Sequence, residues 1–432
     1  MGEELRSVRV EAERCRGRMA CLRACPTEAI RVRNGRAAIL EDRCIDCGEC
    51  VRACPNGAIQ PLTESFRDFA RFRYTVALPS PALYGQFRRE ILPGAILRAL
   101  TRIGFDDASD LAWAGEAVSV AIDEYLAEYR GPLPLISPFC PAVVRLVQAR
   151  FPALVDQLVP IDSPMEIAAR EVKLHKAAHL GLRIEEIGVI YVTPCPAKIV
   201  AVEFPPRKRV SYLDGAIAIA DLYQPLLAAL ARESEPVGEV QTVHGLGLAW
   251  PVLGGQAACL RTEDTLAVGG LREVARILED VENGKLSELQ YLECHACPQG
   301  CCSGPLTVDN PYFARSKILH LVSRYGRQPS RDREQIRALY RQGYFALPGR
   351  FPPQPFPPLD TDIPRAIEKR SRMKEILEAL PRIDCGACGA PTCRSFAEDV
   401  VQGRAALEDC AVLTAEQARR HRHTALAEGI QR

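Results

Sequence analysis

The sequence has no long uncharged apolar run. None approaches the roughly 20 residues that a membrane-spanning helix requires. The first residues, MGEELRSVRVEAERCRG, contain neither the apolar core nor the cleavage site of a secretory signal. We therefore expect a cytoplasmic protein without a membrane span. A strong charge of either sign is also missing, because the formal net charge of +1 gives no general attraction to nucleic acid or membranes.

Motifs for nucleotide binding and serine catalysis are missing as well. The chain has no Walker loop, no G-x-G-x-x-G after an expected strand and no serine-nucleophile elbow. The short stretch Val268-Gly269-Gly270 is too small to cradle a nucleotide. With 432 residues, 47% of them hydrophobic, the chain is long enough for two to four globular domains.

Cysteine is the residue that the sequence has in excess, with 18 in the chain. Cytosolic thiols stay reduced and a chain of this size needs no disulfide framework, so metal ligation is the better interpretation. The cysteines also fall into tight groups. Only Cys259 stands alone, and we expect it to be a small buried hydrophobic residue.

The cysteines near the N-terminus follow the spacing of a two-cluster ferredoxin. The run CIDCGECVRACP has the form C-x2-C-x2-C-x3-C-P, in which three close cysteines bind one [4Fe–4S] cubane and the fourth crosses to another. The repeats PTEAI and PNGAI mark two equivalent half-units, so we predict a ferredoxin-type iron–sulfur domain over residues 1–62. One predicted site takes Cys25, Cys44, Cys47 and Cys50, and the other takes Cys15, Cys21 and Cys54.

The second of these sites lacks a cysteine. Arg18 stands where the pattern has one, and a guanidinium stays protonated and is a poor iron ligand. Three interpretations stay open for this site: a [3Fe–4S] cluster, a cubane with a non-protein fourth ligand, or no cluster. Zinc is a weaker alternative for both sites because their cysteines interlock.

Apolar runs of strand length alternate with amphipathic segments between about Tyr74 and Tyr325, which predicts an α/β core with mainly parallel strands. Three cysteine motifs follow such runs, in PLPLISPFCP, IGVIYVTPCPAK and LQYLECHACPQGC. Each should lie just past the carboxyl end of a strand, where open α/β sheets gather their sites. Pro141 can begin a helix whose free N–H groups face an anionic cluster. The thiols that could complete one cubane are Cys140, Cys195, Cys297 and Cys301; the alternative is scattered buried cysteines.

The order SPFCP, TPCPAK and ECHACPQGC resembles the three signature motifs of the [FeFe]-hydrogenase large-subunit domain, written TSCCP, MPCxxK and ExMxCxxGC. The stretches IDSPMEI and VGGLREVARILEDVENGK extend the likeness, and we expect this domain over residues 70–325. The resemblance implies two parallel α/β lobes around a cubane. Its last cysteine, Cys301, would bridge to a two-iron centre bearing CO, cyanide and a dithiolate. Lys198 would match the lysine that contacts a cyanide.

The departures from the family pattern lie at motif positions around the family's two-iron centre. Phe139 stands where the family's first cysteine delivers protons, and phenylalanine carries none. His295 and Thr193 replace methionines of the motifs. Cys294 and Cys302 are extra thiols that could be ligands, redox-active groups or bystanders. His295 could be a ligand or proton carrier, or simply a satisfied polar residue of a tight loop.

The chain becomes proline-rich after the core, in LPGRFPPQPFPPLD. Residues 326–364 are predicted to form an extended, semi-rigid linker. A loop packed over the core is the alternative, because Phe351 and Phe356 could be buried.

Residues 365–432 are expected to form a small helical [4Fe–4S] domain and a helical tail. A helix from about Arg365 to Leu380 precedes cysteines with the form C-x2-C-x4-C-x16-C, and Gly386 and Gly389 allow a tight turn. The segment CGACGAPTC resembles the iron–sulfur domain of corrinoid iron–sulfur proteins, and zinc is the weaker alternative. The predicted ligands are Cys385, Cys388, Cys393 and Cys410.

The fold class predicted is therefore α/β, with a ferredoxin-like domain, a two-lobed parallel hydrogenase-like core and a small helical C-terminal domain. The first functional hypothesis is an electron-transfer or redox-sensing protein with three to four [4Fe–4S] clusters, similar to the sensory branch of the hydrogenase family. Ferredoxin-like redox proteins, and a separate signalling protein, would be its partners, with no nucleic acid. The alternative is an active hydrogenase, slow or sensory, or another reductase, with a two-iron subsite at Cys301. Its candidate catalytic residues are Cys301, Lys198, His295 and Cys302.

Overall fold

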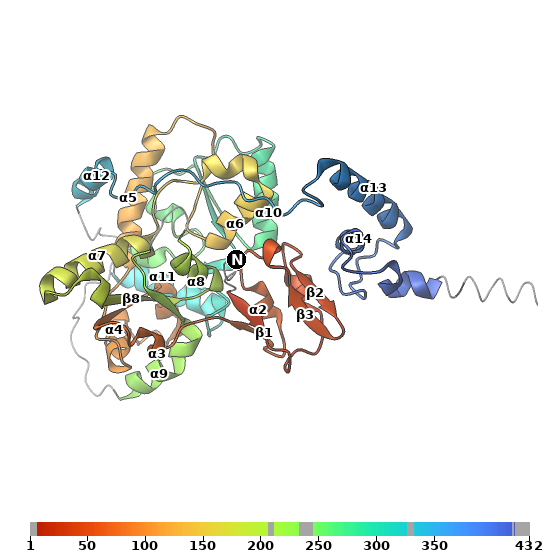
Figure 1. Cartoon of the computed structure of the whole chain (residues 1–432). Coiled ribbons are helices and arrows are strands. Elements are labelled where there is room, and N and C mark those ends of the chain that lie inside the picture. The colour runs from red at the N-terminus through yellow and green to blue at the C-terminus, as the bar shows by residue number, and fades with distance from the viewer. Residues whose placement is uncertain (1–6, 206–210, 233–244, 326–331, 417–418, 420–432) are drawn as a thin grey trace, which may run out of the picture.

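Our computed structural model of the protein describes residues 7–205, 211–232, 245–325, 332–416 and 419. Figure 1 shows an N-terminal domain of short strands beside a large α/β core, with a helical C-terminal domain at its outer side. Within these residues, no helix is long and apolar enough to cross a membrane. The predicted helical tail lies largely outside the described residues.

The N-terminal domain consists of two equivalent half-units, as the PTEAI and PNGAI repeat predicts. Each half-unit has a short helix that ends at a cysteine: α1 (Ala20–Ala24) leads into Cys25, and α2 (Glu49–Ala53) leads into Cys54. The strands pair antiparallel as β1 with β4 and β2 with β3; they are β1 (Val8–Val10), β2 (Ile30–Arg33), β3 (Arg36–Ile39) and β4 (Ile59–Pro61).

The core contains two parallel sheets, as the resemblance implies. The first has the strand order β6-β5-β8-β9 and the second β10-β11-β7, and every pairing in them is parallel. The first sheet consists of β5 (Tyr74–Pro79), β6 (Asp107–Ala108), β8 (Ile187–Thr193) and β9 (Gly215–Ala218). The second consists of β7 (Leu135–Ile136), β10 (Thr265–Gly269) and β11 (Tyr291–His295), and a short strand, β12 (Pro298–Cys301), follows it.

Helices cover both faces of the first sheet, which explains why β8 is apolar along its whole length. Val189 and Tyr191 of β8 pack toward α5 (Ala112–Glu128) and α7 (Pro164–Leu180), whereas Ile190 packs toward the opposite layer. That layer contains α4 (Pro93–Arg102), α9 (Ile219–Ala231) and α11 (Pro311–Tyr325). The remaining helices of the core are α3 (Phe66–Phe69), α6 (Pro141–Arg150), α8 (Pro196–Glu203) and α10 (Leu271–Glu282).

The two sheets share one buried layer, because Leu135 of β7 and Tyr291 of β11 belong to the same apolar cluster as Tyr191 of β8. Strands β7, β8 and β11 all contribute a residue to this layer, although the chain passes between the sheets repeatedly. Loops that follow these three strands can therefore meet.

The segment expected as a linker is packed against the core over part of its length. α12 (Arg333–Arg341) packs on α5, and Phe351 is 3% exposed among residues of α6 and α10. The Gln148 side-chain amide donates a hydrogen bond of 2.8 Å to the Pro352 carbonyl, and the main-chain carbonyl of Gln148 accepts one of 2.9 Å from the Gln354 amide. Phe351 is thus packed as the alternative of a loop over the core predicts, while residues 352–355 are exposed.

The C-terminal domain begins with α13 (Ile363–Ala379), close to the predicted helix, and continues with α14 (Cys393–Val401). Gly386 and Gly389 both adopt the left-handed backbone conformation, with φ of 78° and 80°, as the predicted tight turn requires. The turn returns the chain to α14, which packs on α13.

Candidate functional site

The first cysteine-lined hollow lies in the N-terminal domain. Its wall contains Cys25, Cys44, Cys47 and Cys50, the set that the spacing assigns to one cubane. The Ala29 amide donates to Cys25 Sγ at 3.2 Å, and N–H donors of this kind stabilise thiolates. Burial, followed by the charges of Asp46 and Cys25, raises the pKa of Cys44 to about 12. Ligation of a metal here must therefore expel protons.

A second hollow in this domain is lined by Cys15, Cys21 and Cys54, together with Arg18. The Ala58 amide donates to Cys54 Sγ at 3.2 Å, which repeats the contact of the first half-unit. Arg18 is exposed and lies at the wall where a fourth thiol is missing. The structure thus brings the three predicted cysteines together and leaves the three interpretations of this site open.

A third hollow lies in the C-terminal domain. It is lined by the four predicted cysteines, Cys385, Cys388, Cys393 and Cys410. Burial, and then the charges of Cys410 and Cys385, raise the pKa of Cys388. Among the described residues of the whole chain, no three Cys, His, Asp or Glu side chains form a group that could hold a single metal ion. The predicted cysteines of the two terminal domains line these three hollows instead.

The central cysteines lie beyond the carboxyl ends of strands, as predicted. Cys140 follows β7 and Cys195 follows β8, and each is the N-cap of a helix that begins with proline, α6 or α8. Cys297 lies between β11 and β12, and Cys301 ends β12. The free N–H groups at the starts of α6 and α8 therefore lie beside the thiols.

The four central thiols are near enough to influence one another's ionisation. Burial raises the pKa of Cys297, Arg52 opposes the rise, and Cys195, Cys140 and Cys301 add to it. The Ala296 amide also donates to Cys140 Sγ at 3.4 Å. The strand order of the two sheets thus brings together cysteines that are far apart in sequence, and their joint ligation of one cluster stays a prediction.

Cys301 differs from its neighbours because cationic side chains surround it. Lys198 Nζ lies 3.7 Å from Cys301 Sγ and 3.4 Å from the Tyr191 hydroxyl. Burial opposes ionisation, but Lys198 and the hydrogen bond from His295 lower the pKa of Cys301 to about 6. Lys198 thus contacts the residue that the resemblance makes the bridging cysteine.

His295 belongs to a buried hydrogen-bond network. Its Nε2 lies 2.8 Å from Glu293 Oε1 and 3.3 Å from Gln256 Nε2. Glu293 also accepts the amides of Gly254 at 2.9 Å and Ala257 at 2.8 Å. Glu293 was missed by the sequence reasoning, although it occupies the glutamate position of ExMxCxxGC. The network holds the loop at 254–257 against β11.

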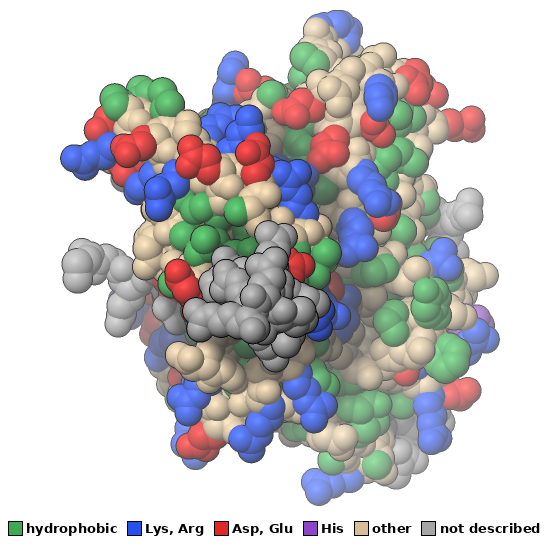
Figure 2. All heavy atoms as spheres, turned by 90° about the vertical axis from the view of Figure 1, so that its right-hand side faces the viewer, with side chains coloured by type: hydrophobic (Ala, Val, Ile, Leu, Met, Phe, Trp, Pro, Cys, Tyr) green, Lys and Arg blue, Asp and Glu red, His purple; other side chains and the backbone are tan. Residues whose placement is uncertain are grey.

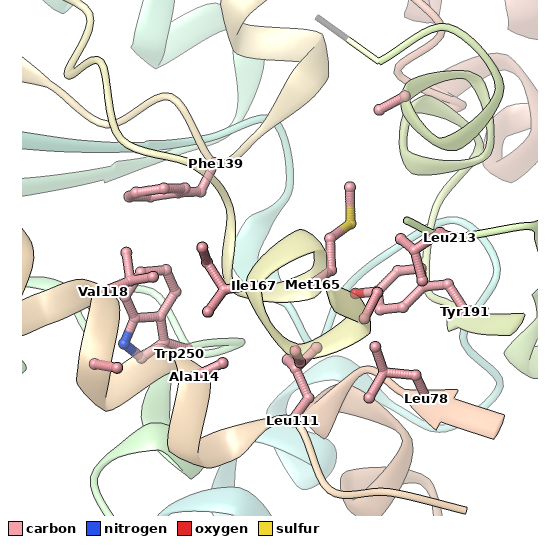
Figure 3. Close-up of a cluster of buried hydrophobic side chains, with 14 of the residues drawn as sticks. Leu78, Leu111, Ala114, Val118, Phe139, Met165, Ile167, Tyr191, Leu213 and Trp250 are labelled. Atoms are coloured by element: carbon pink, nitrogen blue, oxygen red, sulfur yellow. The ribbon is translucent and has the colours of Figure 1, made fainter. Parts of the chain in front are cut away.

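Phe139 lies in an apolar layer. It is 8% exposed, and its ring centroid lies 5.0 Å from that of Trp250. Figure 3 shows it among Trp250, Val118 and Ile167. The position that the resemblance assigns to proton delivery is therefore occupied by packed hydrocarbon.

The remaining candidates have structural contacts. Thr193 Oγ1 donates to the Cys195 carbonyl at 3.1 Å and so shapes that loop. Cys294 lies on β11, and Cys140 contributes to the rise of its pKa after burial. Cys302 is fully buried in the layer of α4 and α9. Cys259 is only partly buried and donates to the Gly255 carbonyl at 3.1 Å.

Arg52 links the N-terminal domain to the central site and was also missed. Its Nη2 lies 3.8 Å from Cys297 Sγ and donates to the Ser303 carbonyl. Gly48, the N-cap of α2, contacts the core so closely that an added Cβ would lie 2.7 Å from Pro305 and 2.9 Å from Pro196. The spacing of the cysteines carries no signal for either contact, because both depend on how the domains pack.

Three family models match successive parts of the chain. The model of the iron-only hydrogenase large subunit, C-terminal domain, matches residues 73–231. A 4Fe–4S dicluster domain matches residues 7–55, and a model for an iron–sulfur cluster matches residues 380–412. The order of these matches agrees with the order of domains predicted from the cysteine motifs.

Similar proteins include iron hydrogenase 1 from Clostridium pasteurianum, 22% identical over 311 residues, which are 59% of this chain and 54% of the relative. The NADP-reducing hydrogenase subunit HndD from Solidesulfovibrio fructosivorans is 28% identical over 114 residues, which are 24% of this chain and 20% of the relative. The chain thus spans about half the length of the first relative and a fifth of the second.

Among solved structures, an apo form of the [FeFe]-hydrogenase HydA1 from Chlamydomonas reinhardtii matches with a TM-score of 0.51 and 17% identity. The match covers 68% of this chain and 97% of that one. At this identity it shows the fold. The matches, the two parallel sheets and the clustered cysteines together show a hydrogenase-like iron–sulfur protein, with a dicluster domain before the hydrogenase-like domain and another iron–sulfur domain after it.

Proposed function

We propose that the protein transfers single electrons, or senses redox state, through iron–sulfur clusters on a hydrogenase-like scaffold, and that it does not turn over hydrogen. The observation that carries this proposal is the contrast at the central site. The four thiols are kept together, while Phe139 and Trp250 pack where proton delivery would be needed.

The cysteine sets fit iron–sulfur clusters. Each hollow has thiols on its walls, and in both N-terminal hollows a main-chain amide donates to a thiol. Bound clusters supply reversible storage of one electron at potentials set by charge, hydrogen bonding and burial. We assign four cluster sites: the two hollows of the N-terminal domain, the hollow of the C-terminal domain and the central thiols. The proposed ligands are the cysteines named for each site above.

The surrounding residues supply positive charge to the central site. Arg52 lies against Cys297, and Lys198 lies against Cys301. Cations near thiolate ligands favour the more negative, reduced form of a bound centre. Together with the apolar layer around Phe139, this arrangement suits a centre that accepts electrons without protons.

The partners proposed are one-electron redox proteins of the ferredoxin type, and the location proposed is the cytoplasm. If the protein acts as a sensor, we propose that a separate signalling protein receives the signal.

A second candidate function is a reductase or hydrogenase with a catalytic centre at Cys301. The contact between Lys198 and Cys301, and the hydrogen bond from His295, favour it. His295 and Glu293 would then replace the missing proton donor. Cys302 is fully buried in an apolar layer, which disfavours it as a catalytic group.

The test compares the anaerobically isolated protein with the variant Phe139→Cys. Iron and acid-labile sulfide are measured first, and three to four cubanes require about 12 to 16 iron per chain. Hydrogen evolution with reduced methyl viologen is then measured. The proposal predicts no hydrogen from either protein. Evolution by Phe139→Cys would show a functional catalytic centre and favour the second candidate.

A further inference from the structure

The C-terminal domain is joined to the N-terminal domain by a buried carboxylate. Asp399 of α14 is 0% exposed and accepts hydrogen bonds from Arg31 Nε at 2.5 Å and Arg31 Nη2 at 3.2 Å. Arg33 Nη2 donates to the same carboxylate at 2.6 Å. Both arginines belong to β2, whose outer side therefore presents charges that match those of α14.

A main-chain contact lies beside this ion pair. The Val32 amide donates to the Gly389 carbonyl at 2.8 Å, which joins β2 to the turn between Cys388 and Cys393. An added Cβ at Gly389 would lie 1.9 Å from the Val32 carbonyl oxygen. The glycine is thus required twice, for its φ of 80° and for the close approach of the N-terminal domain.

The interface extends along both domains. The Thr392 hydroxyl donates to both oxygens of Glu28 at 3.4 Å, and Arg43 pairs with Glu398. Val32 also lines the hollow of Cys15, Cys21 and Cys54, so the docked turn lies on the other side of that hollow's wall. Two cysteine-lined hollows are therefore separated by little more than β2.

The N-terminal domain meets the central site at a different place. Gly48 packs on Pro196 and Pro305, and Arg52 reaches Cys297. Both residues lie in or next to α2, beside the hollow of Cys44, Cys47 and Cys50. The N-terminal domain consequently contacts the central site through one half-unit and the C-terminal domain through β2.

We propose that the C-terminal domain is docked on the N-terminal domain as a fixed part of the electron path, so that it exchanges electrons with the central site by way of the N-terminal domain. This inference rests on the proposed electron-transfer function. Each transfer is a one-electron step: the donor site loses one electron, the acceptor site gains it, and no atom moves. The external reductant is a low-potential, one-electron redox protein.

This order differs from the order along the chain, in which the central site lies between the two terminal domains. Docking places the central site at one end of the path and the C-terminal domain at the other. Figure 2 views the molecule from the side of the C-terminal domain, where acidic and basic side chains alternate over the surface. The specificity of the docking rests on the buried pairing of Asp399 with Arg31 and Arg33.

The test uses two glycine variants of the full chain. Gly389→Ala adds a Cβ that collides with Val32, whereas Gly403→Ala, in the same domain with φ of 70°, adds one with nothing within 4 Å. Backbone strain is common to both, so only the first should separate the domains. We expect hydrogen exchange at the Val32 amide to accelerate at least about tenfold in Gly389→Ala and to stay unchanged in Gly403→Ala. Equal exchange rates in the two variants would overturn docking at this site.

Asp399→Asn tests the same interface without a change of backbone conformation, with Asp362→Asn as its control. Asp362 is the N-cap residue of α13, at the start of the same domain, and its carboxylate lies 3.5 Å from Arg365 Nε in an exposed ion pair. The magnetic interaction between the reduced C-terminal and N-terminal sites, measured by electron paramagnetic resonance, should disappear in Asp399→Asn and persist in Asp362→Asn. Persistence in both variants would overturn the proposed path.

Iron and sulfide analysis separates failure of this inference from failure of the proposed function. Filled sites with unchanged magnetic interaction in Asp399→Asn contradict the path alone. A wild-type protein without iron and sulfide contradicts the electron-transfer function on which the path rests.

Discussion

Single charged side chains tune the environment of the central thiols. Of the three charged side chains described at this site, Lys198 and His295 come from the core itself. Arg52 comes from the N-terminal domain. It acts on a site built from residues far away in the sequence, since Cys297 lies more than 200 positions after Arg52. A substitution at Arg52 should therefore change the central site while leaving its cysteines intact.

We predict that Arg52→Gln lowers the midpoint potential of the central site by about 30–60 mV, because loss of a nearby cation disfavours the reduced form. A redox titration followed by electron paramagnetic resonance measures this change. Arg9→Gln is the control, since Arg9 pairs with Glu11 in an exposed position of the same domain. An equal potential in the two variants would show that Arg52 does not act on the site.

A buried carboxylate in the core gives a separate prediction about pH. Burial raises the pKa of Asp110 to about 6, although the hydrogen bond from Tyr84 opposes the rise. Its folded-state pKa thus lies above the ordinary value, so the native state loses stability as pH rises from about 4 through about 6. Asp110→Asn removes this loss and keeps an acceptor for Tyr84.

The variant Asp110→Asn should therefore gain stability relative to the wild type as pH rises, reaching about 2–3 kcal/mol near pH 7 and little below pH 4. Thermal unfolding of the two proteins at a series of pH values measures the difference. A difference that is constant across this range would mean that Asp110 is not the titrating group.

At the scale of elements, the start of α2 forms the contact between the N-terminal domain and the core. Gly48→Ala would place a Cβ 2.7 Å from Pro305, whereas Gly35→Ala, with a similar φ of 72°, would meet nothing within 4 Å. Both variants bear the strain of a positive φ, about 1 kcal/mol. We predict that only Gly48→Ala exposes the interface, which hydrogen exchange of α2 and α8 would detect. Comparable exchange in both variants would argue against tight docking of α2.

The elements also show how far sequence reasoning extends. Buried parallel strands such as β8 are continuous apolar runs, and each motif cysteine follows such a run, so its place at a strand end could be predicted. The contact of Arg31 with Asp399 joins residues 368 positions apart and could not be predicted. No local pattern encodes such a pairing, because it depends on how two finished domains fit together. The burial of Phe351 could not be predicted either, because the proline-rich composition of its segment is typical of an extended linker.

At the scale of the whole molecule, the cysteine-lined sites form a series. The C-terminal domain docks on β2, the N-terminal domain contacts the central site through α2, and the central thiols follow strands of both sheets of the core. Phe139, which the resemblance places at the proton-delivery position of [FeFe]-hydrogenases, packs on Trp250. This arrangement suits a molecule that moves electrons toward a central site without a proton supply.

The central claim is that this site holds a cluster for electron transfer and has no two-iron centre. The most direct test is an anaerobic infrared spectrum of the protein from its native host, in the region of metal-bound CO and cyanide stretches. The account predicts no bands there in a sample whose iron and sulfide content shows filled clusters. Bands in that region would contradict it, because they would show that a two-iron centre is bound beside Cys301.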